Sequence, residues 1–173
     1  MQHKMNLAEL KYVYLIGIGG IGMSGLARYF KTMGKSVSGY DKTPSSLTDE
    51  MEEEGIKIHF DDDVSKINPE IISHPSPKDT LVIYTPAVPE ELSELIYFKK
   101  QDFNIHKRAE VLGFITEGHY TVAIAGTHGK TTTTTMLTHI LKSAQVDCMA
   151  FLGGVSKNYP VCRGFAFGLW GWA

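Results

Sequence analysis

The first residues that could do chemistry form a glycine-rich loop near the start of the chain. Residues 17–22 read Gly-Ile-Gly-Gly-Ile-Gly and fit the pattern G-x-G-x-x-G. Glycines at these spacings allow a tight turn and let backbone N–H groups approach a diphosphate. A helix that begins at the loop adds partial positive charge for the anion. Asp41, 19 residues after Gly22, is placed to accept hydrogen bonds from a nucleoside.

The same glycines would also suit a loop that only lets a helix pack closely on a strand. The order of strand, glycine loop, helix and acidic residue favours a nucleotide diphosphate instead. This pattern does not choose NAD over another nucleotide that contains a diphosphate. An NAD-dependent oxidoreductase of the Rossmann type therefore stays open on these residues alone.

A second loop with phosphate-binding character lies about a hundred residues further on and ends in Gly-Lys-Thr. Its backbone N–H groups would surround phosphates, Lys130 would contact the β- and γ-phosphates, and the Thr131 hydroxyl would bind Mg²⁺. Ile124 stands where the full G-x-x-x-x-G-K-[ST] pattern has its first glycine, so this loop is shorter. The predicted ATP-binding residues are Gly126, Thr127, His128, Gly129, Lys130, Thr131 and Thr132. For Thr133–Thr135 we predict ordinary helix positions.

Both loops need strands and helices to present them, and the hydrophobic pattern supplies an alternation of the two. Strands are predicted at Tyr12–Gly17, Ser36–Asp41, Ile56–Phe60, Leu81–Thr85, Phe103–His106, Thr121–Ala125 and Met149–Leu152. Helices are predicted at Ile21–Met33, Ser46–Glu54, Glu90–Gln101 and from Lys130 to Ser143. The segment Asn68–Asp79 holds three prolines and is predicted to be a surface loop.

Strands that alternate with helices predict an α/β fold with parallel sheets. Near Thr116–His119 the pattern starts again with a new strand and a new glycine loop. We predict a Rossmann-like parallel-sheet domain at 1–116 and the start of a P-loop ATP-binding α/β domain at 117–159. Residues 160–173 form an atypical tail, which carries both tryptophans of the chain.

Composition excludes several classes of protein. The 173 residues are 43% hydrophobic and 21% charged, which argues against a wholly disordered chain. A net charge of −2 gives no basic field for nucleic acid or an anionic membrane. Apolar runs reach only five residues, as in Tyr12–Ile16, whereas a membrane span needs roughly 20. With only Cys148 and Cys162, no disulfide framework is expected, and we predict a cytoplasmic protein.

Together the two loops make the sequence similar to the Mur ligase family. The stretches that carry the resemblance are Gly17–Gly25, Ser38–Asp41, Arg108–Glu110, Gly126–Thr132 and Phe151–Gly154. The resemblance implies that the first domain binds the UDP part of UDP-N-acetylmuramate rather than NAD. The residues that it implies for this site are Gly17, Gly19, Gly20, Ile21, Gly22, Met23, Ser24, Asp41, His59, Thr85, Pro86, Ala87 and Arg108.

The resemblance also implies an ATP-dependent reaction of peptidoglycan synthesis with Mg²⁺. An acyl phosphate would form on the muramyl carboxylate, and the amine of L-alanine would then displace phosphate. Lys130 and Thr131 would be the catalytic residues, with Thr131 also as metal ligand. A muropeptide-recycling ligase of the same family is the nearest alternative, and no oligomeric state is predicted.

The resemblance ends near Asn158-Tyr159, where the family continues toward an acidic motif and this chain does not. We interpret residues from about 160 onward as atypical for the family. The expected consequence is a chain that retains UDP-sugar binding, is inactive by itself and binds ATP weakly or not at all. A nucleotide-sensing module without catalysis is the third class of function that the sequence leaves open.

Overall fold

The computed structural model describes residues 6–73, 76–117, 119–152 and 165–166. The chain divides into two compact units, Met1–Tyr120 and Thr121–Ala173, and each is described by itself. Of the stretches named above, Gly153 and Gly154 lie outside the described residues, as do Asn158-Tyr159 and all of the tail except 165–166.

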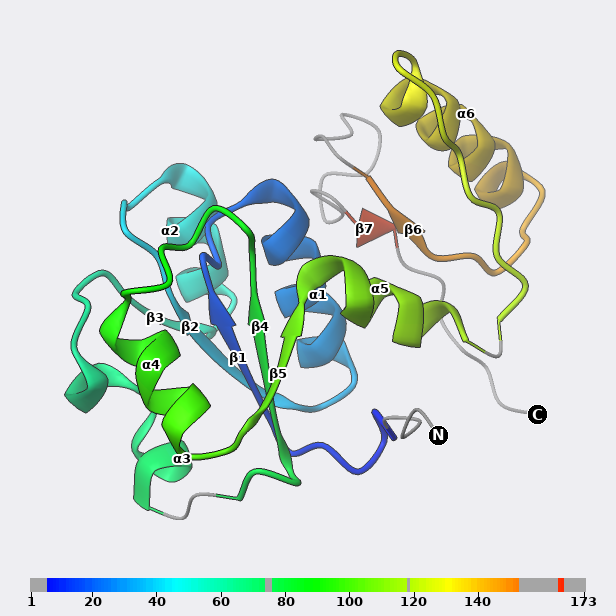
Figure 1. Cartoon of the computed structure of the whole chain (residues 1–173). Helices are drawn as coiled ribbons and strands as arrows, with labels where there is room; N and C mark the ends of the chain where they lie inside the picture. Colours follow the sequence, from blue (N-terminus) through cyan, green and yellow to red (C-terminus); the bar gives the residue numbers. More distant parts are fainter. Residues whose placement is uncertain (1–5, 74–75, 118, 153–164, 167–173) are drawn as a thin grey trace. The chain divides into compact units, whose positions relative to one another are not determined.

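The first unit is built on a five-stranded parallel sheet in the order β3-β2-β1-β4-β5 (Figure 1). Its strands are β1 (Tyr12–Ile16), β2 (Ser36–Tyr40), β3 (Lys57–His59), β4 (Thr80–Tyr84) and β5 (Asn104–Lys107). In β1, Val13 pairs with Val37 on one side and with Leu81 on the other. Chain order thus reverses beside β1, which is where α/β sheets form a crevice for ligands. The predicted Rossmann-like α/β domain is confirmed.

Helices cover both faces of this sheet. The first unit contains α1 (Ile21–Thr32), α2 (Ser46–Glu53), the short 3₁₀ helix η1 (Val64–Lys66), α3 (Pro69–Ser73), α4 (Ser93–Lys100) and α5 (Arg108–Thr116). Figure 1 shows α3 and α4 on one side of the sheet and α1 and α5 on the other. An ion pair joins α1 to the end of α2, with Nε of the buried Arg28 2.9 Å from both carboxylate oxygens of the exposed Glu54.

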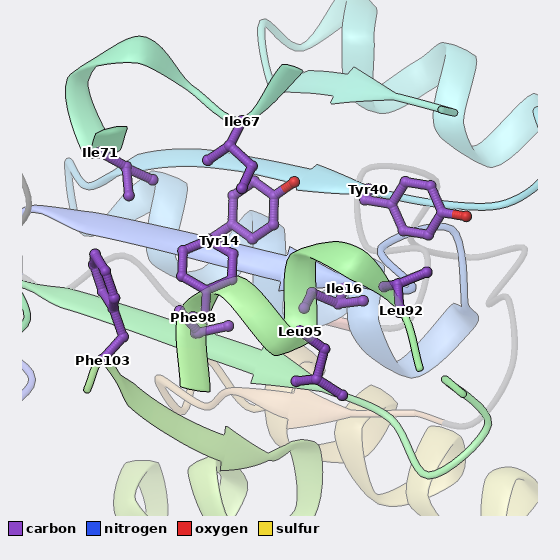
Figure 2. Packing of buried hydrophobic residues seen from close by; sticks show 10 residues of the cluster. Tyr14, Ile16, Tyr40, Ile67, Ile71, Leu92, Leu95, Phe98 and Phe103 are labelled. Atoms are coloured by element: carbon purple, nitrogen blue, oxygen red, sulfur yellow. The ribbon is translucent and has the colours of Figure 1, made fainter. Parts of the chain in front are cut away.

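Alternation along the strands decides which side chains meet which helices. Tyr14 and Ile16 of β1 point toward α4 and pack with Leu95 and Phe98 (Figure 2). Val13 and Leu15 are also fully buried and therefore point to the opposite face, which α1 covers. The central strands β1 and β4 are buried on both faces, as their nearly unbroken apolar runs require.

Three sequence predictions in this unit were wrong or incomplete. The predicted loop Asn68–Asp79 contains α3, because Pro69 is suited to the first turn of a helix. The helix predicted from Glu90 begins only at Ser93, where Asp62 accepts hydrogen bonds from the amides of Ser93 and Glu94. Helix α5 was not predicted, since it follows β5 directly without a turn signal.

The described part of the second unit contains α6 (Lys130–Ser143) and a short antiparallel ladder of β6 (Ala150–Phe151) with β7 (Phe165–Ala166). The helix has the predicted bounds, and β6 lies within the predicted strand Met149–Leu152. The strand predicted at Thr121–Ala125 is wrong: these residues form no strand, and Val122 is 56% exposed. A strand exists only by pairing, and within the described part β6 pairs with β7 and not with this segment.

Gly39 of β2 is required by close backbone packing. A Cβ at this position would lie 2.3 Å from the carbonyl oxygen of Leu15 and 3.0 Å from Ile18 Cδ1. We expect Gly39→Ala to destabilise the first unit by at least about 3 kcal/mol, because backbone must move to admit the methyl group. Urea unfolding followed by circular dichroism measures this change.

The matched control is Gly113→Ala in α5, where a Cβ would meet nothing within 4 Å. This variant should gain roughly 0.5–1 kcal/mol from helix propensity. Equal unfolding midpoints for the two variants would contradict the packing role of Gly39.

Candidate functional site

The glycine loop leaves β1 through a turn that only glycine adopts easily. Gly17 has a φ of 84°, in the left-handed region. The amides of Gly17 and Ile18 both donate to the carbonyl oxygen of Tyr40, at 2.8 and 3.1 Å. The end of β2 therefore holds the start of the loop, and the loop then leads directly into α1 at Ile21.

The amides of the loop separate into those used within the protein and those available to a ligand. Gly19 donates to Asp41, Gly20 to Gly17, and Met23 and Ser24 to Gly20. The amides of Ile21 and Gly22 have no acceptor among the described residues. Because both lie in the first turn of α1, these two N–H groups are the donors of the loop that remain for an anion.

Arg108 brings a positive charge to the same turn. A Cβ at Gly22 would lie 3.0 Å from Arg108 Nη1 and 3.3 Å from its Cζ, so the guanidinium lies against the helix start. The first residue of α5 carries this side chain, and Glu110 begins the helix by accepting a hydrogen bond from the amide of Lys107 at 2.7 Å. Within the described residues Arg108 forms no salt bridge, so its charge is available to an anion.

Asp41 follows β2 and contacts the loop directly. Its Oδ2 accepts from the amide of Gly19 at 2.7 Å, and its Oδ1 accepts from the amide of Thr43 at 3.1 Å. A carboxylate oxygen has more than one lone pair, so both can still accept from a hydroxyl of a ligand. The structure thus places Asp41 beside the glycine loop, where it also supports the loop.

The remaining predicted residues lie at the same edge with different accessibility. The Thr85-Pro86-Ala87 turn follows β4, and a Cβ at Gly17 would lie 3.7 Å from Thr85 Oγ1. Pro86 and Ala87 are exposed. Ile21 is 44% exposed, whereas the side chains of Met23 and Ser24 are buried, so those two side chains cannot reach a ligand here.

His59 is engaged within the protein on both sides of its ring. Its Nε2 lies 2.7 Å from the Tyr14 hydroxyl and 3.3 Å from Glu94 Oε1, and its Nδ1 lies 3.0 Å from the carbonyl oxygen of Asp61. The Tyr14 hydroxyl is also 2.6 Å from Glu94 Oε2. We call these three side chains the Tyr14–His59–Glu94 cluster. In this arrangement neither ring nitrogen of His59 is directed to a ligand.

The cluster is buried, which shifts the pKa values of its members. Burial raises the pKa of the Glu94 carboxyl to about 7; the Tyr14 hydrogen bond opposes this rise, and the charges of Asp62 and Asp63 add to it. Burial lowers the pKa of His59, against the opposing effect of its hydrogen bond to Asp61. Burial and then the Glu94 charge raise the pKa of Tyr14.

Sequence reasoning missed Tyr14 and Glu94. The signals were present: a hydroxyl within a buried strand needs a partner, and Glu94 interrupts the apolar face made by Leu95 and Phe98. Residues 49–63 include four acidic side chains with structural partners. Glu50 and Glu54 pair with Arg28, Asp62 holds the start of α4, and Asp63 accepts from the amide of Ser65.

The second loop begins α6. Gly129 has a φ of 79° at the helix start, and the Lys130 ammonium donates to the carbonyl oxygens of Gly126 and Thr127. Thr131 and Thr132 are exposed, and their hydroxyls have no partner among the described residues. In contrast, Thr134, Thr135 and Thr138 donate to carbonyl oxygens one turn back, at 2.7–2.8 Å. The hydroxyls at the start of the threonine run, Thr131–Thr133, are thus the available ones among the described residues.

The described residues contain no group of three or more His, Cys, Asp or Glu side chains arranged to hold a metal ion. No helix among them has the length and apolar character needed to cross a membrane.

Comparison with known proteins identifies the family. The model of the Mur ligase family, catalytic domain, matches residues 12–120, and the chain belongs to this family. It is 55% identical over 155 residues to the UDP-N-acetylmuramate--L-alanine ligase of Parabacteroides distasonis. That match covers 90% of this chain and 33% of the relative, so the chain spans about a third of its length.

Two solved structures resemble the fold. The UDP-N-acetylmuramate-alanine ligase of Thermotoga maritima matches with a TM-score of 0.77 and 29% identity, covering 91% of this chain and 35% of that one. A UDP-N-acetylmuramate:L-alanyl-gamma-D-glutamyl-meso-diaminopimelate ligase from Neisseria meningitides matches with a TM-score of 0.74 and 26% identity. That match covers 87% of this chain and 45% of the Neisseria chain.

The contact between Gly19 and Asp41 generates a test of the loop geometry. A Cβ at Gly19 would lie 2.8 Å from Asp41 Oδ2 and 3.1 Å from Thr48 Cγ2, whereas one at Gly20 would meet nothing closer than 3.6 Å. We expect Gly19→Ala to cost about 1–3 kcal/mol by displacing Asp41, and Gly20→Ala less than about 0.5 kcal/mol. Chemical denaturation measures the free energy of unfolding of both variants. Equal losses in the two would show that Asp41 is not packed on the loop.

Proposed function

We propose that the first unit binds the UDP part of UDP-N-acetylmuramate at the carboxyl ends of β1, β2 and β5. The diphosphate is held by the amides of Ile21 and Gly22 and by the Arg108 guanidinium. Asp41 accepts hydrogen bonds from the nucleoside, and the Thr85-Pro86-Ala87 turn lies beside it. His59 contributes through the position of its backbone rather than through its ring nitrogens.

One observation carries this proposal: two N–H groups and a guanidinium that have no partner within the described residues lie at the same helix start, beside the Asp41 carboxylate. Donors of this kind attract a diphosphate, because helix charge, amides and guanidinium all favour an anion. A separate acidic acceptor a short distance away suits the hydroxyls of a nucleoside. The 55% identity to a UDP-N-acetylmuramate--L-alanine ligase supports the choice of ligand.

For the second unit we propose an ATP site at residues 126–132. Its residues fit a nucleotide phosphate, since Gly129 begins α6 in the left-handed region and the Lys130 ammonium already lies on the carbonyl groups of the loop. Lys130 would contact phosphate and Thr131 would supply one oxygen to Mg²⁺. A bound Mg²⁺ would supply positive charge to neutralise the transferred phosphoryl group.

The proposed reaction of the longer proteins that this chain resembles is the joining of L-alanine to UDP-N-acetylmuramate through an acyl phosphate, in the cytoplasm, as a step of peptidoglycan synthesis. For the 173-residue polypeptide assayed by itself we propose UDP-sugar binding without ligation. A muropeptide-recycling ligase is the second candidate function, because the Neisseria structure also resembles this chain. The two differ in the amine that attacks, whereas both use UDP-N-acetylmuramate according to their names.

Arg108 offers the sharpest test of the diphosphate site. Arg108→Gln should weaken UDP binding by roughly 10- to 100-fold, the value of one or two hydrogen bonds to a charged group. Binding of uridine, which has no phosphate, should not change. Isothermal titration calorimetry with UDP, UDP-N-acetylmuramate and uridine measures all three affinities.

Lys107→Gln is the matched control, because it removes the same charge from the neighbouring exposed residue. An equal loss of UDP affinity in both variants would reduce the role of Arg108 to general electrostatic attraction. No change in either variant would remove Arg108 from the site.

A ligand panel separates the classes of function. We expect UDP-N-acetylmuramate to raise the melting temperature of the chain by several degrees at about 100 times its Kd, by mass action on the folded state. NAD should have no effect and ATP with Mg²⁺ little or none. Stabilisation by NAD alone would favour an oxidoreductase, and stabilisation by ATP alone would favour a nucleotide-sensing module.

A further inference from the structure

The Tyr14–His59–Glu94 cluster lies directly behind the proposed nucleoside site and has no role in it so far. Tyr14 and Glu94 are fully buried, and Figure 2 shows Tyr14 within the apolar cluster between β1 and α4. The cluster joins three elements: Tyr14 comes from β1, His59 from the end of β3, and Glu94 from the first turn of α4. A polar group kept in such a place needs satisfied hydrogen bonds or it destabilises the fold.

The contacts determine how many protons the cluster holds. The carbonyl oxygen of Asp61 can only accept, so His59 Nδ1 at 3.0 Å carries a proton. The Tyr14 hydroxyl has one proton but contacts both Glu94 Oε2 and His59 Nε2. Both contacts are hydrogen bonds only if one further proton is shared between Glu94 and His59. Glu94 Oε1 lies 3.3 Å from His59 Nε2 but accepts no hydrogen bond within the described residues, and a fully buried carboxylate without one is costly, which favours the neutral acid.

The cluster also determines where Asp41 lies. The amide of Asp41 donates to the carbonyl oxygen of His59 at 3.1 Å, and the rings of His59 and Tyr40 have centroids 5.7 Å apart. The segment that follows His59 is held on the other side by α4, whose first amides donate to Asp62. Movement of His59 would therefore move the residue that contacts the nucleoside.

We propose that Tyr14 and Glu94 are positioning residues for the nucleoside site, which share one proton with His59 and so hold the β3 end that supports Asp41. This inference rests on the proposed function for its ligand, but not for its account of the cluster. In the neutral form Glu94 donates to Tyr14 and Tyr14 donates to His59. When Glu94 ionises, the single Tyr14 proton serves either Glu94 or His59, and the other contact is lost.

The charged groups around the cluster set the direction of the pH dependence. Glu94 faces Tyr14 of β1, His59 of β3, and Asp62 and Asp63 of the following loop, whose negative charges oppose its ionisation. His59 is also influenced by Asp61 and by Lys66 of η1. Because the folded Glu94 binds its proton more tightly than an unfolded chain does, its contribution to stability is fully present below pH 4.5 and is lost as pH rises to about 7. Nucleotide affinity follows the protonated fraction of the folded chain and should fall as pH rises through about 7.

The first experiment measures UDP-N-acetylmuramate affinity by calorimetry from pH 6 to pH 8, where the diphosphate and carboxylate of the ligand stay ionised. Wild-type affinity should fall by up to about tenfold, the ratio of protonated fractions for a group that titrates near 7. Glu94→Gln, which mimics the neutral acid, should bind as tightly as the wild type at pH 6 and show no such fall. The control Glu91→Gln, an exposed carboxyl before the same helix, should keep the wild-type profile. A flat wild-type profile, or an unchanged fall in Glu94→Gln, would overturn the proposal.

The second experiment needs no ligand and so separates this inference from the proposed function. Nitrogen-15 NMR of the free chain should show His59 at pH 7 with a proton on Nδ1 and none on Nε2. In Tyr14→Phe, hydrogen exchange of the Asp41 amide should be at least about tenfold faster relative to Ile83 of β4, whose exchange reports the stability of the sheet. A doubly protonated His59 would disprove the neutral cluster. Equal acceleration at Asp41 and Ile83 would show that the cluster stabilises the domain without positioning Asp41.

Discussion

The carbonyl oxygen of Tyr40 accepts hydrogen bonds from two successive amides, Gly17 and Ile18, and the whole binding edge depends on this contact. It joins the end of β2 to the exit of β1, so the glycine loop cannot turn elsewhere. Gly39 makes the approach possible, because any side chain there would overlap the Leu15 carbonyl. Once the strands meet in this way, the first turn of α1, Asp41 and Arg108 converge without further adjustment.

The hydrophobic pattern was sufficient to predict the strands of the sheet. The central strands β1 and β4 are buried on both faces, and their short apolar runs are readable from the sequence alone. The starts of α1 and α6 were predicted from the glycine loops that precede them, and α2 begins at a local cap made by Ser45 and Thr48. The start of α4 depends on Asp62, more than thirty residues earlier, and no local signal reports such a cap.

Some features of the candidate site could likewise be predicted from the sequence, and others could not. Motif spacing predicted Gly17–Gly22 and Asp41, because their roles depend on backbone conformation and on strand order. It did not predict which amides remain unpaired, since that depends on Tyr40 and Asp41 accepting the others. Nor did it predict the Tyr14–His59–Glu94 cluster. Its members are far apart in sequence and meet only because β1, β3 and α4 lie together in the folded domain. The strand at Thr121–Ala125 failed because apolar sequence alone cannot supply a pairing partner.

The direct junction of β5 and α5 restricts what changes this edge can accept. Lys107 ends the strand and Arg108 begins the helix, with no loop residue between them. Pairing of Tyr84 with Lys107 therefore sets the position of the guanidinium. A one-residue insertion or deletion within β5 would turn each later side chain to the opposite face of the sheet. Length changes at this junction should consequently be poorly tolerated.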